Sequence, residues 1–204
     1  MMQSNLPHWI RPWRRSIALT LAITMLGLGL FVSSASATVM KHADLERLIE
    51  ISDFIVHGRI VEQDTYFDEE QDRVVTDTTI SIERDFTGQL DDKVTIQQWG
   101  GEHDGKFHSI PGDARFESDE EVIVFLHQGD DDVIALSALS QAKYSVETTD
   151  DGKLVSRDLS DITFYIEGPD GGNVKHVPGE TRSYASFVAE LEALVAGIKE
   201  VHNE

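Results

Sequence analysis

The sequence predicts a mainly β protein, a small barrel or sandwich with one short helix before the strands and one amphipathic helix after them. Two observations predict this class. Short runs rich in β-branched residues recur through the middle of the chain, and Asp- and Gly-rich turns separate them. With 204 residues and a 40% hydrophobic fraction, the chain is long enough for one packed core. We therefore expect residues 38–204 to form a single domain.

The first 37 residues predict export. They carry three arginines and no acidic residue, and an uncharged apolar stretch covers residues 17–32. This order, followed by an Ala-Ser-Ala element that ends at Ala37, is typical of a secretory signal peptide. We expect cleavage between Ala37 and Thr38 and a periplasmic or extracellular location. An uncleaved anchor is the alternative, because the apolar stretch approaches the length of a membrane span.

Acidic residues dominate the rest of the chain. The sequence has 17 Lys and Arg against 37 Asp and Glu, a formal net charge of −20, and without the three N-terminal arginines residues 38–204 carry −23. A basic surface is the electrostatic footprint of nucleic-acid binding, so this charge argues against nucleic-acid partners. The chain has no cysteine, which excludes disulfides, Cys-ligated metals and a thiol nucleophile.

The predicted elements begin with a helix over residues 41–52, which Asp44 can cap and which places apolar residues on one face. A β-branched, mostly apolar run over 54–63 predicts a strand buried on much of both faces. Residues 74–86 alternate between apolar or Thr side chains and mostly polar ones, which predicts a strand with one buried face.

Shorter elements follow. The remaining predicted strands, all bounded by turn residues, are 93–99, 122–127, 133–136, 143–147, 154–157 and 162–166. Ser183 is a candidate N-cap for a final helix that extends to about Val201. Apolar residues form a single stripe along that helix, which predicts that it packs on the core.

Several segments resemble a family of uncharacterised bacterial exported proteins. The likeness is carried by DLERL at 44–48, SDFIVHGRIV at 52–61, TDTTISIE at 76–83, FTG at 86–88, VTI at 94–96, GG at 100–101, PGDARF at 111–116, EEVIVFL at 120–126 and QAKY at 141–144. That family resembles the oligonucleotide/oligosaccharide-binding (OB) type of barrel found in netrin-like modules and tissue inhibitors of metalloproteinases. The resemblance implies an OB-like barrel and no catalytic residues. Those inhibitors use an N-terminal cysteine, which this chain lacks, so inhibitory activity is not implied.

One compact group of metal-ligand residues lies in residues 102–108, which we expect to be a loop. His103, Asp104 and His108 offer two imidazoles and a carboxylate, suitable ligands for zinc. The alternative is a solvated turn, since the spacing matches no established metal motif and Lys106 would oppose a cation. Acidic runs at 68–72 and 130–132 raise the question of calcium. Neither has the staggered ligands of a calcium loop, so solvated turns are favoured.

Trp99 is the only tryptophan after the predicted cleavage site. Two interpretations stay open: an exposed platform for a partner, or a plug that closes the core, which is favoured for so large an apolar ring.

These observations predict an exported, non-catalytic module that binds an unknown protein or glycan. The alternative is a metal-dependent hydrolase that uses His103, Asp104 and His108. A purely structural envelope component is the third hypothesis.

Overall fold

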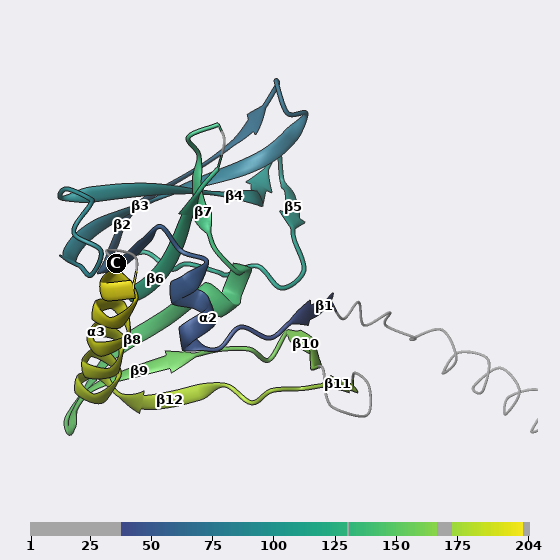
Figure 1. Ribbon diagram of the computed structural model, residues 1–204. Helices are drawn as coiled ribbons and strands as arrows, with labels where there is room; N and C mark the ends of the chain where they lie inside the picture. The colour runs from purple at the N-terminus through teal and green to yellow at the C-terminus, as the bar shows by residue number, and fades with distance from the viewer. Residues whose placement is uncertain (1–37, 130, 167–172, 202–204) are drawn as a thin grey trace, which may run out of the picture. The chain divides into compact units, whose positions relative to one another are not determined.

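β-Strands make up most of the fold (Figure 1). The structure is a computed structural model that describes residues 38–129, 131–166 and 173–201, so the predicted signal peptide and its end at Ala37 lie outside the described residues. The elements are β1 (Thr38–Lys41), α2 (Leu45–Glu50), β2 (Phe54–Asp68), β3 (Arg73–Asp85), β4 (Lys93–His103), β5 (Lys106–Ser109), β6 (Glu121–Gln128), β7 (Ile134–Leu136), the 3₁₀ helix η2 (Leu139–Ala142), β8 (Lys143–Thr149), β9 (Gly152–Arg157), β10 (Ile162–Ile166), β11 (Asn173–Lys175), β12 (Glu180–Ser183) and α3 (Tyr184–Val201).

The larger sheet has the strand order β12-β9-β8-β6-β2-β3-β4-β5, and β7 pairs with β6 beside this path. Each neighbouring pair in this sheet is antiparallel. The predicted mainly β class with two helices is therefore confirmed. The sheet path does not return to its first strand within the described residues, so closure into a barrel is not shown.

A bulge distorts the pairing of β2 with β3. His57 pairs with Arg84 and Gly58 pairs with Ile82, which leaves Glu83 as the extra residue. The two strands approach so closely here that a Cβ atom on Gly58 would lie 2.3 Å from the carbonyl oxygen of Ser81. Position 58 therefore requires glycine because of this close contact with Ser81, and not because its backbone conformation disfavours other residues. Bulges commonly redirect a side chain, and this one turns a residue of β3 toward β2.

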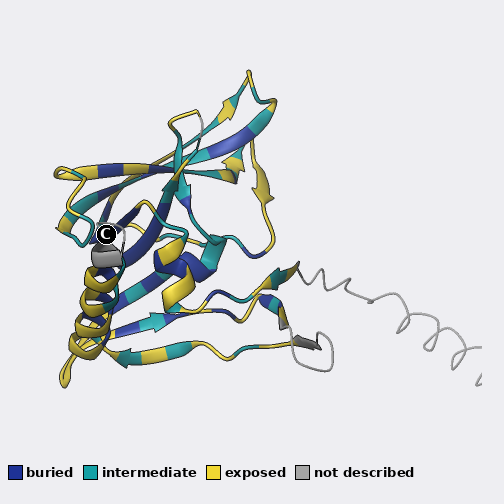
Figure 2. Cartoon of the chain, in the orientation of Figure 1, coloured by how far each residue is buried: buried dark blue, intermediate teal, exposed yellow. Residues whose placement is uncertain are grey.

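The main core lies between the larger sheet and the two helices. Strand β6 is buried from Glu121 to Leu126, whereas the outward face of α3 is exposed (Figure 2). Phe187 and Leu191 of α3 are fully buried, and the ring of Phe187 lies 4.7 Å from that of Tyr144. The predicted core-facing role of the final helix is thus confirmed. None of the described helices has the length and apolar character needed to cross a membrane.

A smaller sheet corrects the predicted N-terminal helix. β1 pairs in parallel with β10, which also pairs with β11, so Lys41 is a strand residue and not the start of a helix. The helix is confined to α2, where the carboxylate of Asp44 accepts a hydrogen bond from the backbone N–H of Arg47, as the capping prediction requires. β1 is only four residues long and its pairing partner is distant in sequence, so local pattern gave no signal for it.

Candidate functional site

Residues 102–108 form a hairpin, and the prediction of a loop was wrong. β4 continues to His103, and the turn residues Asp104 and Gly105 have φ values of 51° and 68°. A two-residue turn with positive φ at both positions matches the twist of the flanking strands, and Asp-Gly is a preferred sequence for it. That dipeptide was the signal in the sequence from which this hairpin could have been predicted. β5 follows directly and pairs with the end of β4.

Two glycines set where β4 changes partner. Gly100 and Gly101 have φ values of 108° and 130°, which side chains rarely adopt. The hydroxyl of Thr76 donates a hydrogen bond to the carbonyl oxygen of Gly100 at 2.7 Å. β4 pairs with β3 up to Trp99 and with β5 from Gly100 onward. Trp99 therefore stands at the junction between the sheet and the hairpin.

The structure shows Trp99 to be a surface residue, with 55% of its area exposed. It pairs with Val75, and two positions along β3 the guanidinium carbon of Arg73 lies 4.1 Å from the centre of the indole ring. This distance is that of a cation–π contact. The interpretation of Trp99 as a core plug was wrong, because more than half of its area is exposed to solvent.

Trp99 belongs to an apolar surface that we call the hairpin-tip patch, defined by Phe67, Trp99 and Ile110, which line one cavity. These are three of the eight large hydrophobic residues found exposed in the described part of the chain. A cavity of about 630 Å³ lies beside them, lined also by Arg73 and His108. The patch therefore combines exposed aromatic rings with an adjoining hollow.

His103 contributes to this patch through its ring. Its imidazole stacks on Phe67 with 6.2 Å between ring centres and 27° between planes, and its Nε2 atom lies 3.8 Å from the carboxylate of Asp104. His108, across the hairpin, pairs with Gly101. The ligand atoms of the three predicted metal ligands do not all lie within 4.8 Å of one another. Among the described residues, one other set of side chains does bring its ligand atoms that close. Metal binding by His103, Asp104 and His108 stays a prediction.

The acidic runs lie at turns. The carboxylate of Asp68 accepts hydrogen bonds from the backbone N–H groups of Glu70 and Gln71, which orders the tip of the β2–β3 hairpin. In the second run Asp130 lies outside the described residues, and the carboxylate of Asp131 accepts from the backbone of Val133. These contacts are those of turn-forming residues, and calcium binding at either run stays a prediction.

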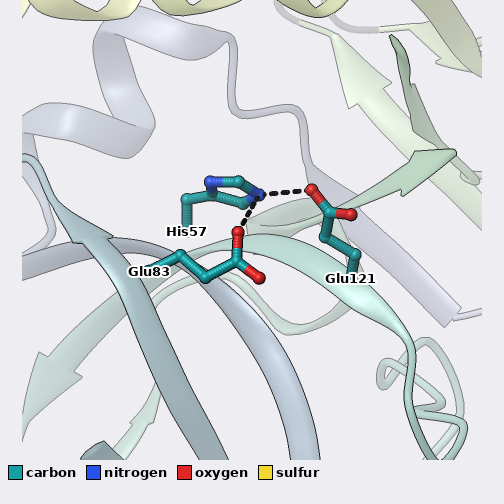
Figure 3. Close-up of side chains that lie close together, drawn as sticks. All are labelled: His57, Glu83 and Glu121. Carbon is teal, nitrogen blue, oxygen red and sulfur yellow. Dashed lines mark hydrogen bonds and ion pairs between the residues drawn. The ribbon is translucent and has the colours of Figure 1, made fainter. Parts of the chain in front are cut away.

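A second cluster, which we call the buried ion cluster, was not predicted. It consists of His57 on β2, Glu83 on β3 and Glu121 on β6 (Figure 3), together with Arg59 and Lys153. His57 and Glu121 are both more than nine-tenths buried. The distances from Nε2 of His57 are 2.8 Å to Oε1 of Glu121 and 3.9 Å to Oε2 of Glu83.

Glu121 is the centre of the buried ion cluster. Lys153 donates a hydrogen bond to Oε1 at 2.6 Å, and Arg59 donates to Oε2 at 3.1 Å. Burial alone would raise the pKa of Glu121, but hydrogen bonds from Lys153 and His57 outweigh burial and hold this pKa below its ordinary value. The same bond to Glu121 raises the pKa of Lys153, against the opposing effect of its partial burial. The carboxylate and the ammonium are thus both charged.

Tyr184 connects this cluster to α3. Its hydroxyl lies 3.1 Å from Nδ1 of His57, so both imidazole nitrogens have a polar neighbour. The sequence offered one signal: a histidine within an apolar strand needs hydrogen-bond partners. It did not identify those partners, because the register of β2 with β6 and the bulge in β3 bring them together.

A polar hollow of about 740 Å³ lies next to Glu121 and extends along β8. Its lining groups already bind each other: Lys143 donates to Glu120 at 2.8 Å, and Ser145 donates to the same carboxylate at 2.7 Å. Asp113, also on its wall, has a pKa raised by burial. Lys143, Ser145 and Glu120 are therefore already paired with one another on the wall of the hollow.

Comparisons of the chain with protein-family models, with curated proteins and with solved structures found no match. The resemblance to exported OB-like proteins therefore stays a prediction, and the candidate sites rest on geometry.

Proposed function

We propose that this protein is an exported, non-catalytic module that binds a protein partner at the hairpin-tip patch. The observation that carries the proposal is the indole of Trp99, which is more than half exposed beside a cavity of about 630 Å³. Trp and Arg are the residue types that most often dominate binding energy at protein interfaces, and Arg73 lies against this ring. An exposed group of aromatic residues next to a hollow is a common sign of an interaction site.

The export signal and the OB-like frame are part of the same proposal. Support for the frame comes from the bulges in the pairing of β2 with β3, because bulges bend long strands as a barrel requires. Support for export comes from the order of charge, apolar residues and small residues in the first 37 positions. In this frame the patch lies where β2 ends, β3 begins and β4 approaches its end.

A protein segment fits the patch better than a glycan. Sugars stack on free ring faces, yet Arg73 lies over one face of Trp99, and the ring of Phe67 is stacked on His103. Ile110, by contrast, is 39% exposed on the wall of the same cavity and offers area to an apolar side chain. The cavity beside the patch is lined by two cations, Arg73 and Lys106, and two carboxylates, Asp72 and Asp104, so these charges balance although the chain carries −20, and a neutral segment meets little repulsion here.

The test compares two variants of the full chain. Immobilised wild-type protein is exposed to envelope extract, and a protein it retains is purified and titrated in solution. Trp99→Ala should weaken this binding at least about tenfold, as expected for a central interface residue. Leu154→Ala, which removes an exposed apolar side chain of β9, should leave binding unchanged.

The fluorescence of Trp99 gives an independent readout. Because Trp99 is the only tryptophan after the predicted cleavage site, partner binding should shift the tryptophan emission of the protein cleaved after Ala37. Equal affinity of the partner for Trp99→Ala and Leu154→Ala would overturn the proposal. Binding of a soluble oligosaccharide that requires Trp99 would show a glycan partner instead and contradict the choice of a protein.

The proposal also predicts that Trp99 matters little for folding. Because its indole is mainly exposed, Trp99→Ala should change the free energy of unfolding by only about 0.5 kcal/mol. Urea unfolding of both proteins measures this, and a large loss of stability would indicate a structural role.

A further inference from the structure

We propose that His57, Glu83 and Glu121 form a site for a divalent transition-metal ion such as Zn²⁺, for which the ammonium of Lys153 is the resident competitor. One nitrogen and two carboxylate oxygens from these residues all lie within 4.8 Å of one another (Figure 3). Imidazole and carboxylate are ligands that zinc accepts, and three protein ligands with one open position is a common arrangement.

The fold builds this site from three neighbouring strands. His57 pairs with Ile123 and Glu121 pairs with Arg59, so the first two ligands lie two positions apart along the β2–β6 ladder. Glu83 is the extra residue of the β3 bulge, opposite the step from His57 to Gly58. The bulge thus supplies the third ligand. The glycine beside His57 permits the close approach of the strands on which the bulge depends.

The site combines a rigid interior with an entrance. The side chains of His57 and Glu121 are 5% and 7% exposed, whereas that of Glu83 is 45% exposed. An ion can therefore reach the imidazole and the buried carboxylate from the side of Glu83. Solvent on that side supplies a water molecule as the fourth ligand.

Lys153 shows that the site attracts positive charge. Its ammonium contacts Oε1 of Glu121, the same oxygen that faces Nε2 of His57. A metal ion must take this position, and Lys153 can leave because its side chain is 39% exposed on β9. Arg59 holds the other oxygen of Glu121 and can stay in place. The two carboxylates are balanced by Arg59 and Lys153 before the exchange, so the ion competes with an existing cation rather than filling a bare negative site.

The hydrogen bonds of His57 adapt to the exchange. Without metal, Nε2–H donates to Glu121 and Nδ1 accepts from the hydroxyl of Tyr184. With metal, Nε2 gives its lone pair to the ion, the ring proton resides on Nδ1, and the oxygen of Tyr184 accepts it. Lys153 keeps its proton when it leaves Glu121. An outer oxygen that accepts the second ring N–H fixes the orientation of a metal-binding imidazole, and the oxygen of Tyr184 lies where it can do so.

The experiment titrates the full chain, first freed of metal with a chelator, with Zn²⁺ by calorimetry and with Co²⁺ by visible absorption. Lys153→Met removes the competitor. The ion then no longer has to break the charged hydrogen bond between Lys153 and Glu121, so metal binding should tighten at least about tenfold. Lys93→Met changes an exposed lysine at the start of β4. It is the matched control and should have no effect.

Ligand variants decide whether the ion binds here. Glu83→Gln removes a half-exposed ligand without disturbing the core, and it should weaken binding about 10- to 100-fold, whereas Glu62→Gln should not. Absence of binding by Lys153→Met would overturn the proposal. So would binding that Glu83→Gln leaves unchanged, or binding lost only in His103→Ala and His108→Ala, which would place the ion at the hairpin. The first two outcomes do not bear on partner binding at Trp99, whereas an ion at the hairpin would lie at the cavity beside Trp99.

Discussion

Nε2 of His57 lies 2.8 Å from Oε1 of Glu121, although the two residues are 64 positions apart in the sequence. Both side chains are buried, and Tyr184 extends the same hydrogen-bonded group to the first residue of α3. A buried carboxylate is tolerated only when cations and hydrogen-bond donors surround it, and here Arg59 and Lys153 complete that shell. The buried ion cluster therefore links β2, β6 and α3 through polar contacts in addition to the apolar core.

The charge of Glu121 should contribute to stability. Glu121→Gln preserves the shape of the side chain but removes its charge and replaces one of the two oxygens that accept from Arg59 and Lys153 with an NH₂ donor. Because Arg59 and Lys153 are partly exposed and can turn to water, we expect a loss of about 1–3 kcal/mol in the free energy of unfolding, less than for a fully buried pair. Urea unfolding at neutral pH measures it. Glu147→Gln, an exposed change on β8, is the control, and equal losses in the two variants would contradict this account.

Two glycine substitutions should have opposite effects. Gly58→Ala places a Cβ atom against the carbonyl oxygen of Ser81, so the strands must separate and stability should fall by about 1–3 kcal/mol. Gly197→Ala, in α3 where no atom lies within 4 Å of the added Cβ, should raise stability by about 0.5–1 kcal/mol through helix propensity. Thermal unfolding of the two variants is the measurement. A neutral Gly58→Ala would show that the bulge does not need this close approach.

Asp85 should make stability depend on acid pH. Burial tends to raise its pKa, but hydrogen bonds from the hydroxyl of Thr87 and from the backbone N–H groups of Leu90, Gln89 and Thr87 outweigh it and lower this pKa below 3.8. Since the folded pKa is the lower one, the contribution is present above about pH 4 and is lost as the pH falls through the folded pKa.

The matching variant is Asp85→Ala, which should cost about 1–2 kcal/mol at pH 7 because several turn donors lose their acceptor. The difference from wild type should shrink at acid pH, when the carboxyl of Asp85 is protonated. Chemical unfolding at several pH values measures this, with Asp91→Ala as an exposed control. A difference that does not change with pH would mean that the charge of Asp85 is unimportant.

Salt should stabilise the protein. With a net charge of −20, repulsion among exposed carboxylates opposes the compact state, and ions screen that repulsion. From about 0.01 M to about 1 M NaCl the Debye length falls from about 30 Å to about 3 Å. The melting temperature should rise across this range, by about 2–4 °C for each kcal/mol of repulsion removed. A flat or falling melting temperature would contradict the prediction.

Several elements were predictable because their signals are local. The alternation over residues 74–86 identified β3 to within one residue at each end, and the apolar stripe identified α3. Asp44 was recognised as a helix cap because its contact reaches only three residues along the chain. Short strands such as β1 and β12 were missed, since three or four residues carry no period and form a strand only because a distant segment pairs with them.

The two candidate sites differ in how far the sequence could lead. Trp99 was a candidate for partner binding from its strand position next to two glycines, but only the structure shows that the ring is exposed and that Arg73 lies on it. The prediction of a loop at residues 102–108 was wrong because the Asp-Gly pair at 104 and 105 was not recognised as a hairpin turn. His57 lies in the run expected to be a buried strand, and a buried imidazole needs hydrogen-bond partners, but the sequence did not identify Glu121 as one of them.

The sequence by itself determined the mainly β class, where the long strands begin, the core-facing C-terminal helix and the acidity of the chain, because composition and short-range periodicity encode them. Only the tertiary structure decided that Glu83 and Glu121 meet at His57 and that Trp99 stands in solvent beside a hollow. The physical reason is that strand register and bulges arise from pairing across the whole sheet. A shift of one residue would turn these side chains to the opposite face.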